Sequence, residues 1–157
     1  MKKCAVTGVF DPITLGHLDI IKRAAQMFDE VVVTVLINPT KEEDLDLNDK
    51  LHIINTAVKD LPRVCVTSYD GMTVDFCAQN DIKFIVRGVR NITDFNYEKS
   101  MADYNLEHGG VETVFLPCRE EYKDISSTLA RSKKEKEELV GILPSGTIDY
   151  YLKHRKQ

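Results

Sequence analysis

Short apolar runs alternate along the chain with longer segments of mixed polarity. The clearest run is VVVTVLI, which is unbroken over residues 31–37. Such a run is typical of a β-strand that is covered on both faces of a parallel sheet. Together with it, five strands are predicted, over residues 5–7, 31–37, 63–68, 83–87 and 112–116.

Helical periodicity fills the segments between these runs. In residues 16–28, for example, Leu18, Ile21, Ala25 and Phe28 lie on one face of a helix. Helices are predicted over residues 16–28, 47–58, 73–79, 93–107, 126–136 and 144–153. The mixed charges of residues 131–138 indicate a solvated helix face.

Alternating strands and helices predict an α/β fold, a doubly wound five-stranded parallel sheet of Rossmann-like type. The chain has 157 residues, which corresponds to one domain over residues 1–157. Its content of 43% hydrophobic and 29% charged residues argues against disordered and fibrous classes. Neither a linker nor an internal repeat divides it.

Charge and hydropathy narrow the function classes further. The formal net charge of −4 argues against general nucleic-acid binding. The sequence contains no apolar run of membrane-spanning length, and the residues after Met1 lack the apolar core of a signal peptide. We therefore expect a cytoplasmic protein without a membrane or nucleic-acid partner.

The cysteines at positions 4, 65, 77 and 118 are widely spaced. They form no CxxC pair and have no histidine at metal-ligand spacing. We expect buried, reduced thiols rather than a disulfide or a zinc site.

Unusual polar residues follow the predicted strands. In an open parallel sheet, ligands bind outside the carboxyl ends of the strands. The segments that come directly after a predicted strand hold most of the Gly, Pro, His and Arg residues that do not suit a core. They are residues 8–17, 38–41, 70–73, 87–98 and 117–128.

The first of these segments ends in His17, in the first turn of a predicted helix. Backbone N–H groups at a helix start favour anions, and a histidine there can donate a hydrogen bond to a phosphate oxygen. The alternative is an ordinary helix-start residue. Gly8 and Gly16 have the wrong spacing for a dinucleotide fingerprint, and the chain has no Walker P-loop. Lys41 follows the second strand. Its interpretation as a ligand-binding residue depends on the other candidate residues that follow strands.

Arg87 and Arg90 flank a glycine at the end of the fourth strand. Arginine forks match phosphate oxygens, so the pair is predicted to clamp a phosphate. The alternative is a pair of structural salt bridges with Asp94 and Glu98.

Three consecutive hydroxyl residues, at positions 126–128, precede a helix and exceed what a helix cap needs.

No nucleophile–base pair stands out beside these phosphate donors. A phosphate that attacks as the nucleophile is already ionised and needs no general base, so the protein has only to position two phosphates.

Four motifs carry a resemblance to a known family. They are VTGVFDPITLGH at 6–17, NPTK at 38–41, RGVRNITDFNYE at 87–98 and ISST at 125–128. In order and spacing they resemble the bacterial-type phosphopantetheine adenylyltransferases of the nucleotidyltransferase α/β superfamily. The resemblance implies transfer of the adenylyl group of ATP to 4′-phosphopantetheine, giving dephospho-coenzyme A and pyrophosphate in coenzyme A biosynthesis. It also implies Mg²⁺, which we expect to be carried with ATP, since the sequence shows no clear carboxylate site and no metal-binding residue.

The resemblance also implies residue roles. His17 would be catalytic and stabilise the transition state at the α-phosphorus. Lys41 and Arg87 would hold the acceptor phosphate, and Thr73 would line the pantetheine arm. The implied ATP contacts are Val9, Phe10, His17, Gly88, Val89, Arg90, Glu98, Tyr122, Lys123, Asp124, Ile125, Ser126, Ser127 and Thr128.

Val9 departs from the family pattern, which usually has threonine there. Position 9 serves both substrates in the family, so one hydroxyl donor is missing here. Two alternatives follow. The protein transfers the nucleotidyl group to another phosphorylated alcohol, or it is a homologue that binds nucleotide or coenzyme A with impaired activity. The resemblance further implies a homohexamer and coenzyme A as a feedback ligand.

Overall fold

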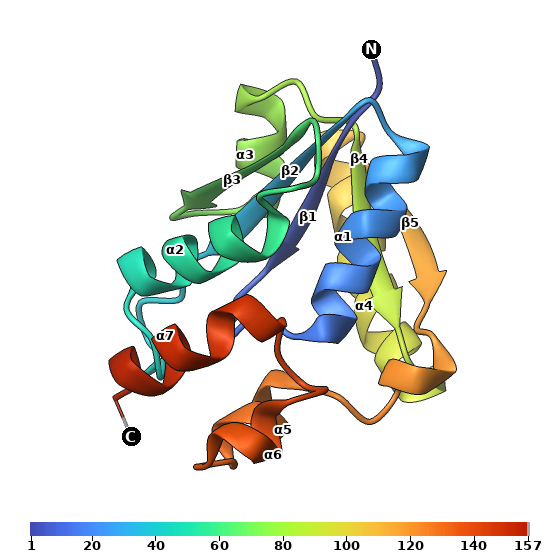
Figure 1. Ribbon diagram of the computed structural model, residues 1–157. Coiled ribbons are helices and arrows are strands. Elements are labelled where there is room, and N and C mark those ends of the chain that lie inside the picture. The colour runs from blue at the N-terminus through green and yellow to red at the C-terminus, as the bar shows by residue number, and fades with distance from the viewer. Residues whose placement is uncertain (157) are drawn as a thin grey trace.

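A five-stranded, all-parallel sheet in the order β3-β2-β1-β4-β5 forms the centre of the computed structural model, which describes residues 1–156 (Figure 1). The strands are β1 (Lys3–Gly8), β2 (Glu30–Leu36), β3 (Val64–Tyr69), β4 (Phe84–Val89) and β5 (Glu112–Pro117). The helices are α1 (Leu15–Met27), α2 (Leu47–Val58), α3 (Thr73–Gln79), α4 (Ile92–Gly109), α5 (Ser127–Arg131), α6 (Lys136–Leu139) and α7 (Ile148–His154). Short 3₁₀ turns cover Glu120–Tyr122 and Ser145–Thr147. The predicted doubly wound α/β sheet is confirmed.

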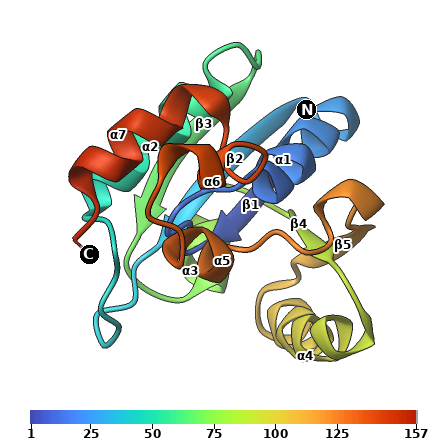
Figure 2. The same ribbon diagram turned by 60° about the horizontal axis from the view of Figure 1, so that its bottom comes forward.

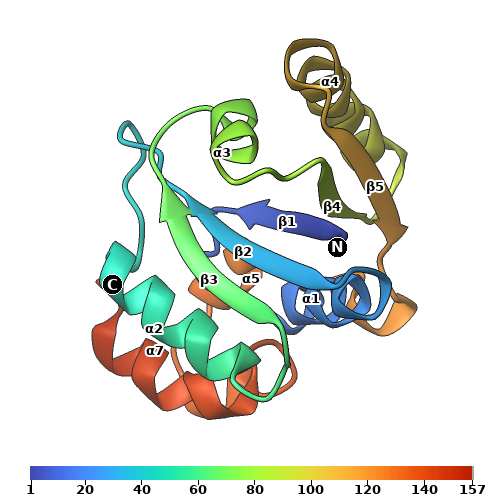
Figure 3. The same ribbon diagram turned by 90° about the horizontal axis from the view of Figure 1, so that it is seen from above.

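Strand β2 is covered on both faces, as its unbroken apolar run predicts. Val31, Val33 and Val35 pack into a core with α1, α2 and α7, whereas Val32 packs into a second core with Phe76 of α3. Figure 3 shows the two layers, with α1, α2 and α7 on one side of the sheet and α3 and α4 on the other. Alternate side chains of one strand therefore hold helices on opposite faces.

The order in which the chain adds strands to the sheet reverses between β1 and β4, and this junction is weakly paired. β1 is in register with β2 over six residue pairs but with β4 over only Cys4↔Phe84 and Ala5↔Ile85. Beyond Ala5 the ladder stops, and the Arg87 guanidinium donates a hydrogen bond to the Thr7 carbonyl instead. The strands thus separate toward their carboxyl ends, at the position where open α/β sheets bind ligands.

The single helix predicted over residues 126–136 is wrong. Helix α5 ends at Arg131 and α6 starts only at Lys136. Arg155, which follows α7, donates hydrogen bonds to the carbonyls of Arg131 (2.7 Å) and Lys133 (2.6 Å). A continuing helix would need those carbonyls for the N–H groups four residues on. A side chain from the C-terminus therefore ends the helix.

Two of the four cysteines differ from the expectation of burial. Cys4 and Cys77 are buried, but Cys65 on the edge strand β3 is exposed and Cys118 is half-buried. All four are free thiols. Burial raises the pKa of Cys4 to about 12 and that of Cys77 to about 11, so both are protonated at neutral pH. Within residues 1–156, none of the helices combines the length and the apolar character that a bilayer crossing requires.

Candidate active site

A cavity of about 1080 Å³ lies at the carboxyl ends of the strands. The turn after β1, the loop after β2, the end of β4 and the segment before α5 all contribute to its wall. Figure 2 brings this end of the molecule forward, with α5 and α6 in front of the strand ends. Segments that are far apart in the sequence therefore meet at one place.

His17 is locked in orientation by the start of α1. Thr14 is the N-cap, and its side chain accepts the His17 backbone N–H (3.4 Å) while its own backbone N–H donates to Nδ1 of His17 (3.0 Å). This is a capping box with histidine in the place of the usual glutamate. Since Nδ1 accepts a hydrogen bond, the neutral ring carries its proton on Nε2, which is left free to act as a donor.

Burial and two positive charges keep the His17 ring neutral. Burial is the larger cause, and the charges of Arg87 and Arg90 add to it; together they lower the pKa of His17 to about 4. The ring of Phe10 contacts it edge-on, with centroids 5.2 Å apart. A neutral imidazole still offers its Nε2–H group to an oxyanion, as a donor that costs no reorganisation.

The ion pairs considered for the two arginines are both present. Arg87 contacts the carboxylate of Glu98 through Nε (2.8 Å) and Nη2 (2.5 Å), and Arg90 lies 3.8 Å from Asp94. These pairs do not remove the arginines from the cavity, because Arg87, Arg90 and Glu98 all line it. The salt bridges hold the guanidinium groups at its wall.

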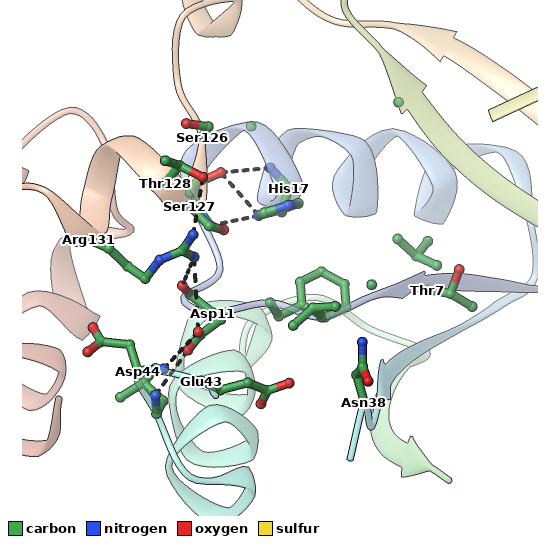
Figure 4. A pocket seen from close by; sticks show the side chains of 18 of the residues that line it. Thr7, Asp11, His17, Asn38, Glu43, Asp44, Ser126, Ser127, Thr128 and Arg131 are labelled. Carbon is green, nitrogen blue, oxygen red and sulfur yellow. Dashed lines mark hydrogen bonds and ion pairs between the residues drawn. The ribbon is translucent and has the colours of Figure 1, made fainter. Parts of the chain in front are cut away.

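The three hydroxyl residues before α5 have separate tasks. Ser126 caps the helix by accepting the Leu129 N–H (3.0 Å), and Ser127 donates to the Pro12 carbonyl (2.7 Å) in the turn after β1. Thr128 accepts from Arg131 (3.1 Å). In Figure 4 these three residues are drawn in the upper part of the pocket, on the side next to His17. The segment is thereby tied to the turn that carries His17.

Most of the site residues expected from the sequence line this cavity. They are Val9, Phe10, His17, Lys41, Arg87, Gly88, Arg90, Glu98, Tyr122, Ile125, Ser126, Ser127 and Thr128. Four others are not part of its lining: Thr73, Val89, Lys123 and Asp124. Thr73 starts α3, which packs against the other face of the sheet, and Lys123 pairs with Glu120 (2.5 Å). Their roles stay predictions of the resemblance.

Asp11 and Arg131 are among the lining residues that the sequence patterns do not point to. Asp11 lies within the first motif, and its carboxylate accepts the backbone N–H groups of Asp44 (2.8 Å) and Leu45 (3.0 Å). The charge pattern of residues 131–138 predicts a solvated face for Arg131, but this residue donates to the Asp11 carbonyl (2.7 Å) and lines the cavity. Its position three residues after Thr128 was the only signal, because that spacing puts both on one side of a helix.

The fold and this cavity are those of a nucleotidyltransferase, and the cytidylyltransferase-like family model matches residues 5–133. A phosphopantetheine adenylyltransferase of Symbiobacterium thermophilum is 48% identical over 132 residues, covering 83% of this chain and 82% of that protein. One from Vesicomyosocius okutanii is 38% identical over 157 residues, covering 99% of each chain. The chain therefore belongs to the phosphopantetheine adenylyltransferase family.

A solved structure supports the fold across the whole chain. The nicotinic acid mononucleotide adenylyltransferase of Plasmodium falciparum, complexed with NaAD, superposes with a TM-score of 0.71 at 14% identity and covers 98% of this chain and 96% of its own. At that identity the likeness concerns the fold alone.

Proposed function

We propose that the protein transfers the adenylyl group of ATP to 4′-phosphopantetheine, with dephospho-coenzyme A and pyrophosphate as products. One observation carries this proposal: His17, Lys41, Arg87, Arg90 and the 126–128 hydroxyls all line one cavity. Its volume of about 1080 Å³ is at the upper end of ordinary ligand sites, in keeping with two phosphorylated substrates side by side. Family membership supports the same activity.

In the proposed reaction an oxygen of the acceptor phosphate attacks the α-phosphorus of ATP in line. A new P–O bond forms, the bond from the α-phosphorus to the bridging β-oxygen breaks, and pyrophosphate leaves with the electron pair. The attacking phosphate is already ionised, so no general base is needed. The neutral His17 would donate through Nε2 to an α-phosphate oxygen as charge gathers there.

The remaining roles follow from the resemblance. Lys41 and Arg87 would hold the acceptor phosphate, and Thr73 would line the pantetheine arm. The implied contacts with ATP are the backbone of Val9 and Phe10, then Gly88, Val89, Arg90 and Glu98, and residues 122–128. The described residues contain no group of three or more His, Cys, Asp or Glu side chains placed to hold a metal ion. We therefore propose that Mg²⁺ enters with the phosphates of ATP, which such ions commonly bridge.

The proposal is tested by pyrophosphate release from the purified protein with ATP and Mg²⁺. We expect release with 4′-phosphopantetheine and far less with other phosphorylated alcohols or with CTP in place of ATP. Release with a different acceptor, but not with 4′-phosphopantetheine, would contradict the proposed substrate.

Val9 makes the two alternatives, another acceptor or an impaired homologue, open to experiment. Its side chain is 36% exposed and lines the cavity at a position where the family usually has a hydroxyl. A hydrogen bond to a charged group contributes about 1.5–3 kcal/mol, so Val9→Thr is expected to raise kcat/KM by about tenfold or more. Val9→Ala serves as the control that changes size without adding a donor. If wild type binds ATP without releasing pyrophosphate and Val9→Thr restores release, the protein is an impaired homologue.

We also propose a homohexamer in the cytoplasm, with coenzyme A as a feedback ligand at the same cavity. Helix α4 supports the assembly, because among its residues only Glu98 is buried in this chain. Its apolar side chains Ile92, Tyr97, Met101, Tyr104 and Leu106 are exposed. Large exposed apolar patches mark interaction surfaces.

A further inference from the structure

The loop between β2 and α2 carries Lys41, and near its end the Glu43 carboxylate pairs with the buried Lys50 of α2. Within residues 38–41 the hydrogen bonds are local, from Thr40 and Lys41 to Asn38. Local bonds shape the loop but do not place it relative to His17. The position of Lys41 therefore depends on what anchors the end of the loop, at Glu43 and Asp44.

Asp44 is bound from two sides. Its backbone N–H and that of Leu45 donate to the two carboxylate oxygens of Asp11, in the turn that leads to His17. Its own carboxylate accepts the hydroxyl of Tyr151 (2.8 Å), and the Arg155 Nε lies 3.4 Å away. Figure 4 shows Asp44 next to Asp11 at the lower edge of the pocket, with Arg131 above.

The C-terminal partners are themselves rigidly placed. Tyr151 is fully buried, and Arg155 lies 4.8 Å from the centroid of its ring. Arg155 also holds the carbonyls of Arg131 and Lys133, while the backbone N–H of Lys156 donates to the Asp44 carbonyl (2.9 Å). Burial and the nearby Asp44 raise the pKa of Tyr151, so its hydroxyl stays protonated and acts as the donor.

Together these contacts join three parts of the site through residues to which the proposed reaction assigns no substrate contact. Asp11 links the turn after β1 to the Lys41 loop, Arg131 links α5 to Asp11, and α7 closes the ring through Asp44. A buried carboxylate is costly unless several donors satisfy it, so a carboxylate at Asp44 needs an explanation beyond packing. Tyr151 and Arg155 lie outside residues 5–133, which the family model matches.

We propose that Asp44 is a positioning residue, which Tyr151 and Arg155 of the C-terminal segment hold in place so that Lys41 faces the acceptor phosphate. The inference rests on the proposed function, since it assigns the Lys41 loop to the acceptor. The C-terminal helix α7 would then contribute to acceptor binding, whereas ATP would be bound by other segments.

The test compares Tyr151→Phe with Tyr150→Phe. Both remove one hydroxyl from α7, but the Tyr150 hydroxyl donates to Asp49 in the first turn of α2 (2.8 Å) and not to Asp44. For Tyr151→Phe we expect the KM for 4′-phosphopantetheine to rise by about three- to tenfold, with the KM for ATP changed by less than about twofold. Tyr150→Phe is expected to leave both KM values unchanged.

Hydrogen exchange of the amides of residues 40–43, measured without substrate, provides a readout that does not need the enzyme activity. We expect faster exchange there in Tyr151→Phe than in Tyr150→Phe or wild type. A wild type that releases no pyrophosphate would remove the proposed function but leave this comparison intact. Unchanged exchange and an unchanged acceptor KM in Tyr151→Phe would overturn the positioning role.

A second variant covers the case in which Tyr151→Phe folds poorly. Asp44→Asn keeps an oxygen for the Tyr151 hydroxyl and loses the charge that faces Arg155. We expect its KM for 4′-phosphopantetheine to be about two- to tenfold above that of wild type, with kcat and the KM for ATP close to wild type. A lower kcat together with an equal rise in the KM values for both substrates would indicate general damage and would contradict the proposal.

Discussion

In the proposed reaction, His17 would combine two tasks that sequence reasoning treats as alternatives. Its Nδ1 completes the cap of α1, and that same hydrogen bond determines the tautomer that leaves a donor on Nε2. The capping role therefore orients the ring for the chemical one. Neutral donors of this kind stabilise charge that develops in a transition state, without the cost of burying a cation.

Removal of this donor is expected to affect turnover more than binding. For His17→Ala we predict a kcat about 10²–10³ lower, with the KM values for both substrates changed little, because the donor acts on charge in the transition state. Initial-rate measurements of pyrophosphate release check this, with the unfolding midpoint as the control for a lost helix cap. Turnover equal to wild type would exclude His17 from the mechanism.

The low pKa of His17 also predicts a pH dependence of stability. The folded ring has a pKa of about 4 against 6.5 for the free side chain, so between these values the unfolded chain takes up a proton that the folded chain does not. The free energy of unfolding should thus fall as the pH drops from about 6.5 toward 4, by up to about 1.4 kcal/mol per pH unit.

Urea unfolding at pH 7, 6 and 5 compares wild type with His17→Gln, which lacks this ionisable group. The loss on acidification should be smaller in the variant. Parallel curves for the two proteins would show that His17 does not have the depressed pKa.

At the scale of elements, the packing of α1 against β4 depends on a residue without a side chain. A Cβ on Gly88 would lie 2.9 Å from Cγ1 of Ile20, closer than carbon atoms pack. Gly88 also lines the cavity, beside Arg87. The glycine therefore allows the helix that carries His17 to approach the strand that carries the arginines.

Gly88→Ala is expected to destabilise the protein by about 1–3 kcal/mol, since an added methyl group must displace Ile20 from the core. Gly146→Ala is the matched control, because its Cβ would meet the nearest atom, Thr56 Cγ2, only at 3.9 Å. Urea unfolding measures both, and the control should change by less than about 0.5 kcal/mol. Equal stabilities for the two variants would contradict the close approach of α1 and β4.

For the whole molecule, the exposed apolar side chains of α4 predict association with other copies, for which we propose a hexamer. We expect wild type to sediment as a hexamer, and Tyr97→Glu to shift it toward smaller species, because a charge in an apolar interface is costly. Met27→Glu, also at an exposed apolar position, is the control. Analytical ultracentrifugation decides, and a monomeric wild type would contradict the proposed assembly.

The sequence by itself determined the fold class and most of the site. The valine-rich run of β2 and the helical periodicities show directly in the sequence which side chains are buried. In a parallel sheet the segments after the strands meet at one edge, so the sequence predicts one cavity for His17, Lys41, Arg87 and the 126–128 hydroxyls. Such inferences succeed because they need only neighbours in the chain and a general rule of topology.

Tertiary structure alone decided how those residues are held. The break between α5 and α6 depends on Arg155, more than twenty residues away, and the placement of the Lys41 loop depends on Asp11 and Tyr151. Hydrogen bonds between distant residues leave no periodicity in the sequence, because their geometry exists only after the chain has folded. For the same reason, the sequence does not predict the role of Arg131. Its charge is typical of a solvated helix face, and only the folded chain brings it to the Asp11 carbonyl.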